Sequence, residues 1–332
     1  MRADDRVPLG GTGLSVTRLG LGLASIGGLF EPVDDEQAAA TVDAAWDCGV
    51  RVFDTAPVYG YGRSEIRAGR ALRDRPRDEY VLCTKVGRLI VAGGADTQPI
   101  WADPPPGVGP RLDYSYAGVM RSFEDSLARL GTGRIDVLHV HDPDQDFGAA
   151  VTGAYRAVAE LRANGLIRAV SIGVNHADVA ARFIREAPGP LDAVLLAGRY
   201  TLFDQSGLQD LLPLCRERGI AVLAAGVFQS GLLAAPRPGP GYGYAEVPAA
   251  VLERARALSG VCARHDVPPL AAAIQFALGH PAVAGVVVGA RQPGEVAHNA
   301  ALLAHAIPAR LWEDLKAAGL LPGDAPVPAA PG

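Results

Sequence analysis

The stretch that says most about the fold is residues 136–174, DVLHVHDPDQDFGAAVTGAYRAVAELRANGLIRAVSIGV. Its first five residues, Asp136–Val140, form a short apolar run that is typical of a buried strand, and Ala169–Val174 form another. The longer segment between them, from about Ala149 to Asn164, is expected to be a helix. A strand, a helix and a strand in this order are typical of a parallel βαβ unit.

The same alternation continues in both directions along the chain. Short apolar runs predict eight strands, at Leu19–Leu23, Val50–Asp54, Val81–Lys85, Asp136–Val140, Ala169–Val174, Ala193–Ala197, Ala221–Ala225 and Gly285–Val288. Helices are expected over 34–48, 64–72, 115–130, 149–164, 176–186, 208–218 and 294–303. This order predicts an α/β fold, a closed (β/α)8 TIM barrel. A doubly wound sheet is the alternative, but the first strand–helix junction, Ala24–Pro32, lacks a G-x-G-x-x-G fingerprint.

Three further segments complete the predicted architecture. A β-hairpin is expected at the N-terminus, with strands at Val7–Leu9 and Leu14–Thr17. Long connections rich in Gly and Pro, Arg88–Asp113 and Gly226–Pro248, follow strands three and seven. Both should lie at the mouth of the barrel, where long loops often act as lids. We expect one TIM-barrel domain over residues 1–332.

Composition and charge narrow the class of protein. Lys and Arg number 31 against 36 Asp and Glu, so the net charge of −5 gives no reason to expect a nucleic acid as partner. The four cysteines are far apart and indicate neither a disulfide framework nor a metal site. The chain shows no secretory signal and no apolar run long enough to span a membrane. We therefore expect a cytoplasmic protein that binds neither a nucleic acid nor a membrane. A monomer and a weak dimer would both fit the sequence.

Ionisable side chains stand at the ends of three successive predicted strands. Asp54 ends the second strand, Lys85 ends the third and His141 follows the fourth. Tyr59 lies just beyond Asp54, after Pro57 and before Gly60, in a sequence typical of a turn. Because the carboxyl ends of barrel strands meet at one mouth, we expect these four side chains to converge there.

These residue types suit proton transfer. A free tyrosine has a pKa near ~10, which is too high for ready exchange at neutral pH. A nearby ammonium such as Lys85 favours the phenolate, and Asp54 would keep that ammonium charged. His141 could hydrogen-bond the oxygen of a substrate. The alternative is a merely structural Asp–Lys pair with ordinary packing of the tyrosine and histidine. His139 and His176 are competing histidines.

Taken together, these motifs resemble the aldo-keto reductase family. The likeness rests on FDTAPVYG (53–60) followed by Gly62, Ser64 and Glu65, on TKVGR (84–88), and on IDVLHVHDP (135–143). It extends over nearly the whole chain. The sequence is most similar to a bacterial branch that contains D-threo-aldose 1-dehydrogenase, L-fucose dehydrogenase and pyridoxal 4-dehydrogenase. The Asp-to-His spacing of the family selects His141 rather than His139.

The resemblance implies a role for each residue. Tyr59 would be the proton donor or acceptor, Asp54 and Lys85 would tune it, and His141 would orient the substrate. The expected reaction is oxidation of an aldose of the fucose or threo-aldose type at C1, giving a lactone and a reduced nicotinamide cofactor. Pyridoxal or a general aldehyde or ketone is the alternative substrate. A nicotinamide-binding regulatory barrel without turnover, and a non-redox sugar lyase or isomerase, are the rivals from other classes.

The same resemblance implies where the cofactor, NAD or NADP, would lie. Asn175 matches the asparagine that binds the nicotinamide carboxamide, although the serine that usually precedes it is Val174 here. The family's stacking tyrosine would fall near Ala225, so Tyr200 or Phe228 is expected to supply the ring.

Residues after the eighth strand would hold the adenosine. The matching positions are Gly289, Arg291, Glu295 and Asn299. Members that prefer NADP carry basic groups here, whereas Arg291 is the obvious cation in this chain. A carboxylate such as Glu295 can bind ribose hydroxyls but repels a phosphate, so we expect NAD to be favoured. Glu295 as a simple helix cap is the alternative. Trp101 and Asp142 are the candidate substrate residues, with Arg199 and Tyr200 beside them.

Overall fold

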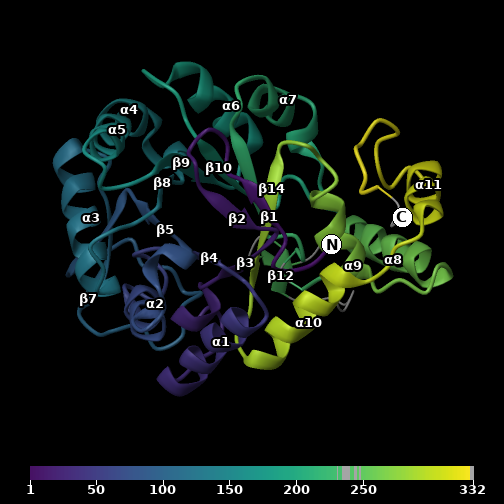
Figure 1. Ribbon diagram of the computed structural model, residues 1–332, viewed down its shortest axis with the longest axis horizontal. Coiled ribbons are helices and arrows are strands. Elements are labelled where there is room, and N and C mark those ends of the chain that lie inside the picture. The colour runs from purple at the N-terminus through teal and green to yellow at the C-terminus, as the bar shows by residue number, and fades with distance from the viewer. Residues whose placement is uncertain (230, 234–239, 243–244, 247, 330–332) are drawn as a thin grey trace.

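Eight parallel strands close into a barrel, which confirms the predicted TIM barrel (Figure 1). The computed structural model describes residues 1–229, 231–233, 240–242, 245–246 and 248–329. The barrel strands are β3 (Leu19–Gly22), β4 (Val52–Asp54), β5 (Val81–Val86), β8 (Val137–His141), β9 (Ala169–Val174), β10 (Ala193–Ala197), β11 (Ala221–Ala225) and β14 (Val283–Gly289). Each lies within two residues of its predicted position, because strands buried on both faces are near-continuous apolar runs.

Helices surround the barrel and cover its outer face (Figure 1). They are α1 (Asp35–Asp47), α2 (Arg63–Leu72), α3 (Tyr116–Leu130), α4 (Phe147–Ala149), α5 (Tyr155–Ala163), α6 (Ala177–Glu186), α7 (Leu211–Glu217), α8 (Ala249–Arg264), α9 (Pro269–Ala277), α10 (Pro293–Ala304) and α11 (Ala309–Ala317). Local chemistry sets several of their ends. Asp34 caps α1 by accepting the Gln37 N–H at 2.7 Å, and Gly131 ends α3 in the left-handed conformation.

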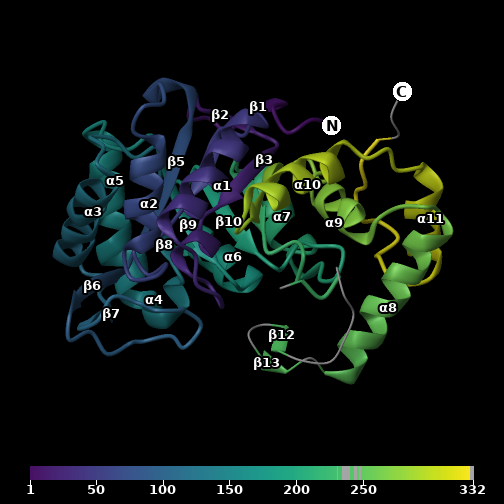
Figure 2. The ribbon, with the colours of Figure 1, turned by 90° about the horizontal axis from the view of Figure 1, so that it is seen from below.

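The core has two layers. A large outer cluster fills the space between the strands and the helices and includes Val194, Val222 and Phe276. A smaller cluster fills the inside of the barrel with residues such as Val52 and Leu223. The predicted N-terminal hairpin, β1 (Arg6–Pro8) and β2 (Ser15–Thr17), closes this inner layer from one end of the barrel (Figure 2).

The two long connections carry more structure than the sequence suggests. The first contains an antiparallel hairpin of β6 (Arg88–Ala92) and β7 (Val108–Leu112), where we expected only a loop. Within the described part of the second, β12 (Pro240–Tyr242) pairs with β13 (Ala245–Glu246). Both hairpins lie at the end of the barrel opposite β1 and β2 (Figure 2). Helices α8, α9 and α11 were also not predicted. In the described ranges, no helix combines the length and apolar character needed to cross a bilayer.

Candidate active site

A cavity of about 290 Å³ opens at the mouth of the barrel, where the strands end. Residues from all eight barrel strands or the loops after them line it. The four residues that the sequence predicts to act together, Asp54, Tyr59, Lys85 and His141, all reach this cavity. Several of the other lining positions are glycines, namely Gly22, Gly173, Gly226 and Gly289. The absence of side chains there lets a flat ring approach the backbone closely.

The Lys85 ammonium lies at the bottom of the site and has three oxygen partners. Its Nζ donates to Asp54 Oδ2 at 2.7 Å and to the Thr55 carbonyl at 2.8 Å, and it also hydrogen-bonds Tyr59. An ammonium has three N–H donors, so this set satisfies it fully. Burial alone would lower the pKa of Lys85, but Asp54 and Tyr59 raise it above its usual value. The lysine is therefore a permanent cation.

Asp54 is held by two partners. Besides Lys85, the His139 Nε2 lies 3.4 Å from its second oxygen. Burial would raise the pKa of Asp54, but Lys85 and His139 outweigh that effect and lower it. Asp54, Cys83 and His139 come close enough to suggest metal ligands. The Lys85 ammonium that already occupies this carboxylate would repel a cation.

Tyr59 is placed by the turn that follows β4. Its N–H donates to the Ala56 carbonyl at 3.1 Å, and its own carbonyl accepts the Ser64 N–H at 3.2 Å. The predicted turn is thus present, and it brings the ring to 4.7 Å from the Lys85 ammonium. The ring also packs against Trp101, with the ring centroids 5.5 Å apart. Trp101 Nε1 donates to Gln98 Oε1 at 3.0 Å, which fixes the indole against Tyr59.

His141, rather than His139, faces the cavity. The His141 and Tyr59 ring centroids are 6.1 Å apart in an edge-to-face arrangement. Burial, with Lys85 and Arg88 nearby, lowers the pKa of His141 well below its ordinary value, so the imidazole is neutral at neutral pH. His139 lies one pleat deeper, with Nδ1 bound to the Ser171 hydroxyl at 2.8 Å, and His176 is outside the cavity lining.

A polar chain of residues forms the wall next to His141. Asp142 Oδ2 accepts from Arg88 Nη2 at 3.2 Å, and Asp142 Oδ1 accepts from Asn175 Nδ2 at 3.0 Å. The Asn175 carbonyl accepts from Arg199 Nε at 2.7 Å. Arg88, Asp142 and Asn175 line the cavity, whereas Arg199 stands behind them. The sequence alone missed Arg88 as a site residue, although a charged side chain directly after a barrel strand was a usable signal.

Of the residues after β14 that we expected near the cofactor, some line the cavity and others do not. Gly289 lines the cavity, while Arg291 and Glu295 lie just beyond its rim. The Arg291 guanidinium pairs with Glu31 at 2.8 Å and donates to the Leu29 carbonyl at 3.2 Å. Glu295 accepts the Arg291 backbone N–H at 2.7 Å, which is the capping contact that we considered as the alternative.

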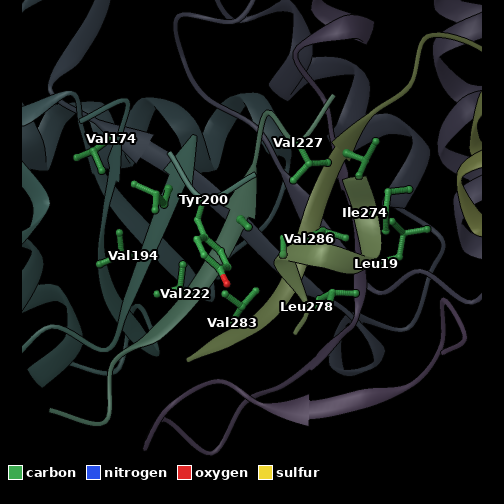
Figure 3. Packing of buried hydrophobic residues seen from close by; sticks show 14 of the residues in the cluster. Leu19, Val174, Val194, Tyr200, Val222, Val227, Ile274, Leu278, Val283 and Val286 are labelled. Atoms are coloured by element: carbon green, nitrogen blue, oxygen red, sulfur yellow. The ribbon is translucent and has the colours of Figure 1, made fainter. Parts of the chain in front are cut away.

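Three expected cofactor residues lie elsewhere. Tyr200 is 1% exposed and packs in the outer core against Phe276, among residues such as Val222 and Val283, so it cannot stack on a cofactor (Figure 3). Asn299 lies on the buried side of α10 beside Val288 and does not line the cavity. Phe228 packs partly buried against the outer core and is not among the described lining residues. For Tyr200 and Asn299, packing places the side chain in the interior of the protein.

Comparison with known proteins gives a consistent result. The model of the Aldo/keto reductase family matches residues 18–319. Pyridoxal 4-dehydrogenase of Microbacterium luteolum is 42% identical and covers 97% of this chain and 99% of its own length. D-threo-aldose 1-dehydrogenase of a Pseudomonas species is 40% identical, over 93% and 96%. The holo form of aldo-keto reductase AKR11C1 from Bacillus halodurans aligns with a TM-score of 0.76 at 26% identity, covering 94% and 95%.

Proposed function

The chain belongs to the aldo/keto reductase family and is an oxidoreductase, and from this we propose which reaction it catalyses. The proposed reaction is oxidation of an aldose at C1, where a hemiacetal carbon carries both a hydrogen and a hydroxyl group. Loss of a hydride from the carbon and a proton from the hydroxyl gives a lactone. The observation that carries the proposal is the bonding of the Tyr59 side chain to the permanent Lys85 cation.

In the proposed mechanism, Tyr59 takes the proton. The ammonium beside it stabilises the phenolate, and Asp54 keeps that ammonium charged inside the protein. Neutral His141 donates a hydrogen bond to the substrate oxygen and so orients the reacting carbon. Trp101, which packs against the Tyr59 ring, would help to exclude water from it.

The cavity fits a nicotinamide cofactor, which accepts the hydride when it is bound. The glycines at the strand ends leave room for a flat ring, and Asn175 offers an amide to a carboxamide. Gly289 and the segment after β14 would hold the adenosine side. Tyr200 lies in the core, so it cannot supply a stacking ring. Among the described residues, Tyr59 and Trp101 line the cavity with aromatic rings, and we assign both to the substrate.

Pyridoxal is the second candidate substrate. The observation in its favour is the 42% identity with pyridoxal 4-dehydrogenase of Microbacterium luteolum. Pyridoxal can close to an internal hemiacetal, so the same proton transfer to Tyr59 would serve. A panel of aldoses, pyridoxal and simple alcohols, followed through NADH absorbance, tests the proposal. Oxidation of a sugar or of pyridoxal decides between the two, and NADH binding without any turnover would favour the regulatory barrel.

Replacement of the phenol tests the mechanism. We expect Tyr59→Phe to lower kcat by about 10²- to 10⁴-fold, the usual contribution of a positioned acid or base, while NADH binding changes little. Tyr116→Phe is the matched control, since its hydroxyl binds Glu160 on the outer surface. Turnover of Tyr59→Phe at the rate of the control would remove Tyr59 from the mechanism.

We further propose that NAD is the preferred cofactor. The Arg291 charge is already neutralised by Glu31, and Glu295 adds a second carboxylate, so the rim disfavours a ribose phosphate. We expect kcat/KM to favour NAD over NADP at least about tenfold, and Glu31→Gln to reduce that ratio because it frees Arg291. Glu124→Gln, on the exposed side of α3, is the control. A preference for NADP in the wild-type enzyme would contradict this proposal.

A further inference from the structure

The Asp142 side chain lies between two cavity residues and touches both. One carboxylate oxygen accepts from Arg88, and the other accepts from the Asn175 amide. A carboxylate is only an acceptor, so the amide atom that faces it must be the nitrogen. The Asn175 amide oxygen is then turned away from Asp142 and is available as an acceptor for a ligand. The carboxylate thus decides which way the amide points.

Asp142 is itself held unusually firmly. Its φ of 43° lies in the left-handed region, which costs a non-glycine residue free energy and persists only where the surroundings enforce it. The surroundings here do so: its N–H donates to the Gly173 carbonyl at 2.9 Å. The Tyr114 hydroxyl lies 2.5 Å from the carbonyl oxygens of both His141 and Asp142. These contacts, together with Arg88, hold the Asp142 carboxylate in one position.

Asn175 is fixed from its backbone as well. Arg199 Nε donates to its carbonyl at 2.7 Å, and Arg199 pairs with Asp204 at 3.0 Å. The asparagine is thus held at two points, with its amide oxygen as the free acceptor that a primary amide of a ligand would meet. A nicotinamide carboxamide has such an N–H donor.

We infer that Asp142 is a positioning residue, which orients the Asn175 amide to accept a hydrogen bond from the nicotinamide carboxamide, rather than a residue that binds the substrate. The inference rests on the proposed function, because it requires a nicotinamide cofactor in the cavity. It assigns Asp142 a different role from the expected contact with the substrate, because both of its oxygens accept from protein donors. His141 lies nearby, with its Nε2 3.7 Å from Asp142 Oδ2, but the inference gives Asp142 no role in proton transfer.

A double-mutant cycle tests this inference. Asp142→Gly removes the carboxylate and suits the positive φ, so the backbone is not strained. We expect this variant to raise the Kd for NADH about tenfold, the usual effect of losing one fixed hydrogen bond, with the KM for the substrate nearly unchanged. Asn175→Ala should have a similar effect. Because Asp142 acts through Asn175, the double variant should bind NADH no more weakly than Asn175→Ala. Asp142→Asn, which can still accept from Asn175, should recover part of the loss.

The possible results distinguish a failure of the inferred Asp142 role from a failure of the proposed function. Independent effects that multiply in the double variant would overturn the positioning role. So would a raised substrate KM with an unchanged Kd for NADH in Asp142→Gly, which would make Asp142 a substrate residue. Either result would leave the proposed function intact. Failure of the wild-type protein to bind NADH or NADPH would overturn both.

Discussion

At the scale of single residues, Lys85 explains why the site is both charged and buried. Its side chain is 2% exposed, and that of its partner Asp54 is 5% exposed. Moving two charges out of water is costly, and their mutual attraction compensates only when the geometry is good and every donor is satisfied. Here the three N–H donors of Lys85 meet three oxygens, one of which is the Tyr59 phenol. Tyr59 therefore completes a network that also stabilises the fold.

This arrangement predicts a separation of stability from activity. Lys85→Met leaves Asp54 buried without its cation, so we expect it to lower the free energy of unfolding by about 3–5 kcal/mol and to abolish turnover. The double variant Asp54→Asn/Lys85→Met removes both charges and should regain much of the stability but none of the activity. Urea denaturation measures the first effect, and NADH formation measures the second. A Lys85→Met variant as stable as the wild type would contradict the prediction.

At the scale of elements, the turn after β4 decides where the phenol lies. Gly60 has a φ of +60°, and a Cβ atom there would collide with the Gly27 carbonyl in the loop after β3. The two loops therefore pack backbone against backbone. This contact fixes the position of the adjacent Tyr59. A residue larger than glycine at position 60 would force the two loops apart.

The contact predicts that Gly60 is essential to the site. Gly60→Ala should cost more than about 2 kcal/mol, the sum of left-handed strain and overpacking, and should lower kcat by displacing Tyr59. Gly93→Ala is a matched control, because its φ of +68° is similar but its surroundings are open. That variant should lose only about 1–2 kcal/mol from backbone strain and keep its activity. Thermal melts and steady-state kinetics check both variants, and equal effects would refute the role of the loop contact.

At the scale of the whole molecule, His280 couples stability to pH. It is buried where the chain enters β14, its Nδ1 accepts the Ala282 N–H at 3.1 Å, and its ring packs against Tyr200. Burial, with a smaller effect of Arg216, lowers the pKa of His280 to about 4. The folded protein therefore binds this proton less readily than the unfolded chain, so stability falls as the pH falls from about 6.5 toward about 4.

A variant without the titration isolates this effect. The amide oxygen of His280→Asn can accept the same Ala282 N–H but does not ionise. We expect it to lose less stability on acidification than the wild type. The difference should be on the order of 1–2 kcal/mol, since one pKa unit corresponds to about 1.4 kcal/mol and solvent screening reduces the full value. Unfolding free energies at pH 7 and pH 4.5 provide the comparison. Parallel pH dependences in both proteins would exclude His280 as the cause.

Much of this protein follows from local patterns in its sequence. All eight barrel strands are predictable because parallel strands buried on both faces need continuous apolar runs. The convergence of Asp54, Lys85 and His141 is predictable too, since strand ends of a barrel meet at one mouth. The Gly- and Pro-rich composition of 88–113 concealed the β6–β7 hairpin, in which Arg88 pairs with Leu112 and Ala92 with Val108 across the residues between them.

Only the tertiary structure decided which way individual side chains point. Tyr200 and Asn299 lie in the core, Glu295 caps the Arg291 N–H, and Asp142 binds Arg88 and Asn175. The sequence pattern of a strand specifies where each residue lies in the barrel, because successive side chains point to opposite faces of the sheet. It does not specify the partners that loops and helices bring from elsewhere in the chain. Those partners depend on packing between distant segments, and in this protein they determine how the residues around Tyr59 are oriented.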